Sequence, residues 1–139
     1  MARIYAASSW RNPYQAEIVQ RLRREHEVYD IKNPPYSADF RWEDIGLTLP
    51  CTAHDYREAV LSHPRAAQGF EADFRAMRWA DTGLLILPCG RSAHLELGWM
   101  AGAGKRTIIL TRDGEEPELM ALLADHICLD LDEVMGLLR

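Results

Sequence analysis

The residues best suited to chemistry are concentrated in residues 88–98 (PCGRSAHLELG). An apolar strand is expected to end there, a turn at Gly90 follows, and a helix begins with Ser92 as its cap. Free N–H groups in a first helical turn bind anions, and Arg91 adds a fixed positive charge. Glu96 lies about one turn into this helix, near its positive end, where the helix dipole favours a carboxylate. Its apolar surroundings make that charge costly unless it is used or paired. Its expected apolar surroundings are Leu95, Leu97, Trp99 and Met100.

A second turn, residues 8–12 (SSWRN), also precedes an expected helix and also carries an arginine. Two such turns at one crevice suit a ligand with a sugar and a phosphate, which makes Ser8, Trp10 and Arg11 candidate ligand contacts. Tyr5 lies in the strand before this turn. It either hydrogen-bonds into the crevice or is a core tyrosine with its hydroxyl at the rim.

Two further features are candidates for the same crevice. Asp73 lies on an expected helix and is either exposed or turned inward as a functional acid; the expected buried side of that helix is Phe70, Phe74 and Met77. The long, proline-rich segment 33–50 is predicted to be a loop, and loops of this length are often functional. Its Phe40 and Trp42 are suited to stacking on a nucleobase.

Several partial motifs fail on spacing or context. Residues 102–105 (GAGK) lack the earlier glycine and the following Ser or Thr of a phosphate-binding loop, and a helix end is the better interpretation. The H-x-E at His94 has no P-C-x-x-C downstream, which zinc deaminases require. Cys89 and His94 are too few ligands for a metal ion. Ser92 lacks the second glycine of a nucleophile elbow. We expect no metal and no cofactor.

Length and composition predict one domain over residues 1–139. The net charge is −5, with 47% hydrophobic and 27% charged residues, which excludes a disordered chain. The longest apolar run is far shorter than the ~20 residues of a membrane span, and no signal peptide is visible. Three unspaced cysteines predict a reducing, cytoplasmic location. The mild acidity argues against a nucleic-acid polymer as partner.

Strand and helix patterns alternate along the chain. The predicted strands are residues 3–7, 27–31, 82–87, 106–111 and 127–129. The predicted helices are residues 13–25, 52–62, 64–80, 92–103, 117–124 and 132–138. With right-handed crossovers, this order predicts a single-domain three-layer α/β/α sandwich with a mostly parallel sheet, flavodoxin- or Rossmann-like. The ligand crevice is expected beyond the carboxyl ends of the strands.

Taken together and in order, four motifs resemble the nucleoside 2-deoxyribosyltransferase family, including its N-glycosidase relatives that act on nucleoside 5′-monophosphates. The resemblance extends from Ile4 to about Ile127. It rests on I-Y-x-A-x-S (4–9), Asp73 and Asp81 flanking A-x-x-x-A, LLILP (84–88) and H-L-E-L-G-W-M-A (94–101).

This resemblance implies roles for individual residues. Glu96 matches the family's nucleophile, Tyr5 the residue that orients it, and Asp73 the acid that contacts substrate and assists departure of the base. Ser8 and Arg11 match contacts to a 5′-phosphate. The implied reaction is cleavage or transfer of an N-glycosidic bond through a glycosyl-enzyme intermediate, without a cofactor.

The resemblance also implies contacts around the sugar and between subunits. The turn Gly90-Arg91-Ser92 matches the loop that faces the sugar 5′ position. Met120 matches a segment donated by a neighbouring subunit, which implies a homodimer or a higher homo-oligomer. The chain departs from the transferases at Glu118, where they carry Asn, and at Arg91, where an acidic residue is expected nearby. Both departures favour an anionic ligand over a free nucleoside.

Other functions remain open at this point. The same fold could serve as a non-catalytic nucleotide-binding sensor. A TIR-like NAD glycohydrolase would also use a glutamate in an α/β crevice. A purely structural interaction domain would leave the two arginine-bearing turns unexplained.

Overall fold

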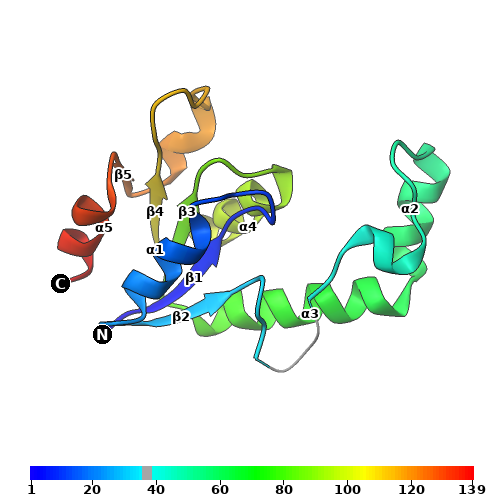
Figure 1. Ribbon diagram of the computed structural model, residues 1–139, viewed down its shortest axis with the longest axis horizontal. Coiled ribbons are helices and arrows are strands. Elements are labelled where there is room, and N and C mark those ends of the chain that lie inside the picture. The colour runs from blue at the N-terminus through cyan, green and yellow to red at the C-terminus, as the bar shows by residue number, and fades with distance from the viewer. Residues whose placement is uncertain (36–38) are drawn as a thin grey trace.

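The computed structural model describes residues 1–35 and 39–139 of the chain. The five strands described form one sheet in the order β2-β1-β3-β4-β5, and every neighbouring pair is parallel (Figure 1). This order, which reverses at β1 and β3, is that of flavodoxin-like sheets and confirms the predicted fold class. The strands are β1 (Arg3–Ala7), β2 (Glu27–Asp30), β3 (Thr82–Ile86), β4 (Arg106–Leu110) and β5 (His126–Cys128).

Helices cover both faces of the sheet. α1 (Gln15–Leu22) and α5 (Leu131–Leu138) pack on one face, and α3 (Pro64–Trp79) and α4 (Arg91–Gly102) pack on the other. α2 (Ala53–Ser62), which is described in full, buries none of its side chains. It lies beyond the far end of α3, away from the sheet (Figure 1). The candidate site described below lies on the sheet face that α3 and α4 cover.

β3 fixes the position of α4. All five residues of β3 (TGLLI) are buried, as expected for a central strand covered on both faces. Gly83 permits a close approach, because a Cβ there would lie 2.8 Å from Met100 Sδ of α4. α4 therefore packs directly on the centre of the sheet, and its register determines where Glu96 lies.

Several predicted elements differ from the structure. Ser92 does not cap α4, because Gly90 is the N-cap and the helix begins at Arg91. The helix predicted over 117–124 is a short 3-10 helix, η2 (Leu119–Leu123), and no side chain caps it. Such a short apolar segment makes too few hydrogen bonds to extend an α-helix. The predicted loop contains the 3-10 helix η1 (Trp42–Ile45), and its residues 36–38 lie outside the described residues.

Three residues expected to be buried are exposed. Phe70 is 65% exposed because it lies on the half of α3 that extends beyond the sheet. Leu95 is 76% exposed, and Trp99 is 38% exposed although its ring contacts Phe74 of α3. Leu97 and Met100 are buried as predicted.

The described part of the chain contains no helix long and apolar enough to cross a membrane. The three cysteines are free thiols: Cys51 and Cys89 are partly exposed and Cys128 is buried. They lie in separate parts of the fold, consistent with the absence of a disulfide framework in the sequence.

Candidate active site

Four side chains from four elements meet on the sheet face covered by α3 and α4. Tyr5 of β1 and Tyr29 of β2 are direct partners in the strand register, and their rings stack with centroids 5.4 Å apart and planes 12° apart. The Tyr29 hydroxyl donates a 2.8 Å hydrogen bond to Asp73 Oδ1 of α3. Glu96 of α4 faces the Tyr5 hydroxyl, and each perturbs the pKa of the other. Two strands thus supply two phenols, and two helices supply two carboxyls.

Glu96 is mostly buried and incompletely paired. Its Oε2 atom is inaccessible to solvent and has no hydrogen-bond partner among the described residues. Burial raises the pKa of Glu96 to about 7; the Tyr5 hydroxyl lowers it in part, and the negative charge of Asp73 raises it further. A carboxylate that changes charge near neutral pH can act as a nucleophile or as a general base.

Tyr5 is the most enclosed member of this group. Its side chain is fully buried, and within the described residues its hydroxyl has no hydrogen-bond partner of standard geometry. Burial, then the charges of Glu96 and Asp73, raise the pKa of Tyr5 far above the usual range. The phenol therefore stays protonated and remains a donor for Glu96 or for a ligand.

The first turn after β1 is tied to the centre of the sheet. The Ser8 hydroxyl donates to the carbonyl oxygen of Ile86 (3.0 Å) and accepts from Asn12 Nδ2 (3.0 Å). Asn12 Nδ2 also donates to Ile86 O (3.1 Å). Ser8 is thus buried and ties the turn after β1 to the last residue of β3, while Arg11 of the same turn is exposed.

Trp10 is flanked by two cations at the crevice mouth. The Arg41 guanidinium lies 4.3 Å from the ring centroid of Trp10 and Lys32 Nζ lies 6.0 Å from it. Lys32 Nζ also donates to the carbonyl oxygen of Asn12. These contacts join the loops after β1 and β2 and place two cations beside Trp10, of which Arg41 also pairs with Asp39 (3.9 Å) and Glu43 (3.6 Å).

The two aromatic candidates of the long loop lie against each other and against α3. Phe40 and Trp42 make an edge-to-face pair with centroids 4.8 Å apart. Phe40 packs so closely on Gly69 of α3 that a Cβ there would lie 3.0 Å from Phe40 Cβ. Trp42 remains 37% exposed. Of the two rings, Trp42 has the greater free surface for a base.

The turn before α4 and Met120 face a different space. Gly90, Arg91 and Met120 all line a cavity of about 810 Å³ between α4 and η2. A second cavity of about 610 Å³ lies between the long loop and α2. Among the described residues, neither cavity is lined by Tyr5, Asp73 or Glu96.

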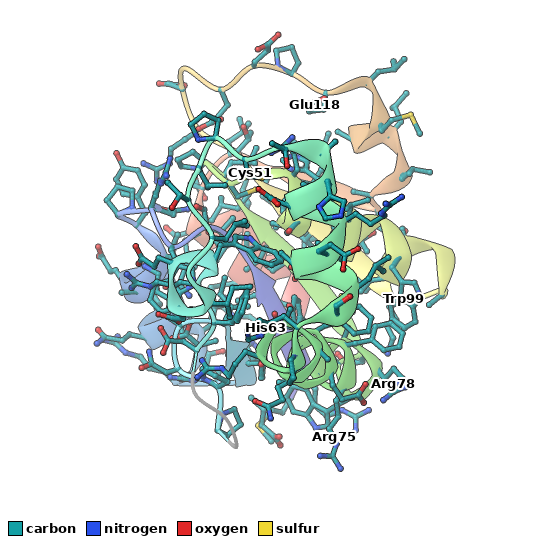
Figure 2. All side chains as sticks on the ribbon, turned by 90° about the vertical axis from the view of Figure 1, so that its right-hand side faces the viewer. Cys51, His63, Arg75, Arg78, Trp99 and Glu118 are labelled. Carbon is teal, nitrogen blue, oxygen red and sulfur yellow. The ribbon has the colours of Figure 1, made fainter. Side chains whose placement is uncertain are left out.

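Aromatic contacts close the site on the side where α3 meets α4. Phe74 of α3 and Trp99 of α4 form an edge-to-face pair with centroids 4.9 Å apart. The Arg78 guanidinium lies 4.8 Å from the Phe74 ring centroid. In Figure 2, Trp99 and Arg78 lie on the same side of the molecule, next to each other at the edge of α3. These contacts hold the two acid-bearing helices at a fixed separation.

Sequence reasoning placed Tyr5, Asp73 and Glu96 at the site and missed Tyr29. A signal was present, because an alternating strand pattern puts Val28 and Tyr29 on opposite faces of β2. The pairing of Tyr29 with Tyr5 depends on the register of two strands far apart in the sequence. It becomes visible only in the folded chain.

The pKa of Glu96 predicts a pH-dependent stability. Its pKa is raised on folding from 4.5 to about 7, so the native state favours the protonated form, and stability is lost as the pH rises through 7. We expect Glu96→Gln to be more stable than the wild type at pH 8 by up to about 3 kcal/mol, and to differ less at pH 5. Urea unfolding at both pH values measures this. The exposed Glu25→Gln is the control, and an equal pH dependence in wild type and Glu96→Gln would contradict the prediction.

Comparison of the sequence with protein-family models and with curated proteins gives no match. Solved structures do match. The 2-deoxyribosyltransferase of the psychrotolerant bacterium Bacillus psychrosaccharolyticus has a TM-score of 0.66 and 23% identity, covering 96% of this chain and 90% of that chain. The CMP N-glycosidase of Clostridium botulinum has a TM-score of 0.55 and 15% identity, covering 98% of this chain and 97% of that chain. Over nearly its whole length, this chain therefore adopts the fold of the nucleoside 2-deoxyribosyltransferases.

Proposed function

We propose that this protein is an enzyme that cleaves or transfers the N-glycosidic bond of a nucleoside or nucleoside 5′-monophosphate. The observation that carries the proposal is the buried Glu96 carboxyl, whose unpartnered Oε2 lies in a group with Tyr5 and Asp73. A buried carboxyl near neutral pKa is costly, and active sites are where such groups concentrate. The likeness to a 2-deoxyribosyltransferase and a CMP N-glycosidase supports the same reaction class.

The residue types suit a two-step reaction. In the first step the Glu96 carboxylate attacks C1′, the C1′–N bond breaks, and the bonding electrons leave with the base. Asp73 supplies the proton that the departing base needs. In the second step Asp73, now a carboxylate, takes a proton from water or an acceptor base as that nucleophile attacks C1′; the C1′–O bond to Glu96 breaks and its electrons return to the Glu96 carboxylate. This is a retaining mechanism, and no step requires a metal or a cofactor.

The rim favours a substrate that carries a phosphate. Arg11 follows β1, Lys32 follows β2, Arg91 follows β3 and Arg112 follows β4, so each of these strands is followed by a cation. Carboxyl ends of parallel strands share one edge of the sheet, which brings the four loops to the same side. We infer that the sugar and base lie over the carboxyl pair and that the phosphate lies toward Arg11 and Lys32, since Arg91 lines the separate cavity beside η2.

The first prediction of the proposed function is release of free base. We expect the wild type to release base from at least one member of a panel of ribo- and deoxyribonucleosides, their 5′-monophosphates and NAD, followed by chromatography. Glu96→Ala should lose at least about 10³-fold in rate, because the nucleophile is gone. Unfolding curves of the variant control for folding.

The outcomes of this panel separate the alternatives. Full activity in Glu96→Ala would exclude the mechanism. Saturable binding without release of base, with or without an acceptor, would identify a nucleotide sensor. Release of nicotinamide from NAD alone would identify a NAD glycohydrolase.

The second prediction concerns the phosphate. Arg11→Ala should lower kcat/KM for a nucleoside 5′-monophosphate by about 10- to 100-fold, the value of one charge-assisted hydrogen bond, and should leave the matching nucleoside unchanged. Steady-state kinetics on the two substrates measure this. Arg57→Ala, an exposed arginine of α2, is the control. Equal losses on both substrates would remove Arg11 from the phosphate pocket.

The third prediction concerns subunits. Met120 is 65% exposed and lies in η2 beside Leu119 (80%) and Leu122 (82%), a large apolar surface for a soluble protein. Glu96 does not line the cavity that Met120 lines, so we infer that Met120 serves the site of a neighbouring subunit. Activity per subunit should fall on dilution, and Leu122→Asp should give inactive monomers in sedimentation velocity. A fully active monomer at low concentration would contradict this role.

A further inference from the structure

Tyr29 makes two contacts that connect the halves of the candidate site. Its hydroxyl donates to Asp73 Oδ1 at 2.8 Å, and its ring stacks on Tyr5 at a centroid distance of 5.4 Å. The side chain is 8% exposed. The two rings are nearly parallel. The Tyr29 hydroxyl contacts Asp73, and the Tyr5 hydroxyl faces Glu96.

We propose that Tyr29 is a positioning residue for Asp73: its hydroxyl fixes Oδ1 and thereby leaves Oδ2 as the oxygen that holds the proton for the departing base. This inference rests on the proposed function, in which Asp73 protonates the base. It adds a residue to which neither the sequence motifs nor the family resemblance gives a role.

The direction of the hydrogen bond locates the proton. The Tyr29 phenol is the donor, because burial and the neighbouring charge of Asp73 raise the pKa of Tyr29 far above neutrality. In a neutral carboxylic acid the carbonyl oxygen is the better acceptor, so a donor at Oδ1 places the acidic hydrogen on Oδ2. Tyr29 therefore selects one of two oxygens that would otherwise be equivalent.

The surroundings of Asp73 favour a proton on this carboxyl. Burial raises the pKa of Asp73, and the hydrogen bond from Tyr29 lowers it in part. The titratable groups facing it are Tyr29 from β2, Tyr5 from β1 and Glu96 from α4. None of the three is a cation. Repulsion between the two carboxyls favours a state in which the pair holds one proton, and when Glu96 is the carboxylate nucleophile that proton is on Asp73.

A purely structural role for Tyr29 makes a different prediction. The stack on Tyr5 and the burial of the ring belong to the phenyl group and are kept in phenylalanine. The contact to Asp73 belongs to the hydroxyl alone. Tyr29→Phe therefore removes the positioning contact while the packing stays, and Tyr56→Phe, at a 63% exposed position on α2, is a matched hydroxyl deletion.

The test combines kinetics with a titration that needs no turnover. We expect Tyr29→Phe to lower kcat by about 10-fold or more with little change in KM, because misplacing a catalytic group slows the chemical step. The apparent pKa of Asp73 within the carboxyl pair should also rise, because Asp73 loses a contact that favours its charged form. Titration of ¹³C-labelled aspartate carboxyls, with Asp73→Asn to assign the signal, should give a higher pKa for Asp73.

The outcomes separate this inference from the proposed function. If the wild type releases base and Tyr29→Phe matches Tyr56→Phe in kcat and pH profile, the inference is overturned. If the titration of Asp73 is unchanged in Tyr29→Phe, the inference is overturned whether or not a substrate has been found. If no substrate releases base but the titration shifts, the proposed function fails and control of the Asp73 proton by Tyr29 stands.

Discussion

Burial of the Glu96 carboxyl, whose Oε2 has no hydrogen-bond partner in residues 1–35 and 39–139, is the constraint on which the rest of the site depends. Removing a carboxylate from water costs free energy. The fold nevertheless holds Glu96 in this buried position on a rigid support. α4 packs directly on β3 at Gly83, and Tyr5 is fixed in the middle of β1. The carboxyl has little freedom to turn back to solvent. A ligand that satisfies Oε2 would recover part of the cost, which links binding to the chemistry.

The acidic and basic side chains of the candidate site lie in different places. The two acids lie on helices over the covered face of the sheet, whereas the cations lie on loops at the carboxyl ends of the strands. Trp10 lies between these zones, with Arg41 and Lys32 on its ring. Burial raises the pKa of both carboxyls, and the charge of Asp73 raises that of Glu96 further.

The sequence predicts the strands, helices and sheet better than it predicts which side chains are covered and by what. The wholly apolar run at residues 83–87 and the alternation of strands with helices predict the sheet, because burial and periodicity are local properties. The apolar surroundings that the sequence predicts for Glu96 are only partly present: Leu97 and Met100 are buried, but Leu95 and Trp99 are exposed. Local pattern shows that α4 has apolar positions and does not show which of them another element covers. The same limit explains Phe70, on a half-helix beyond the sheet, and Tyr29, whose partner is set by strand register.

This division between core and loops bears on how one fold can take different ligands. Tyr5, Tyr29, Asp73 and Glu96 lie on strands and helices, and their positions follow from packing of the sheet. Arg11, Lys32, Arg91 and Arg112 lie on loops or at a helix start, where a substitution leaves the core unchanged. A change of substrate from a neutral to an anionic nucleoside then requires new loop residues and the same carboxyl pair.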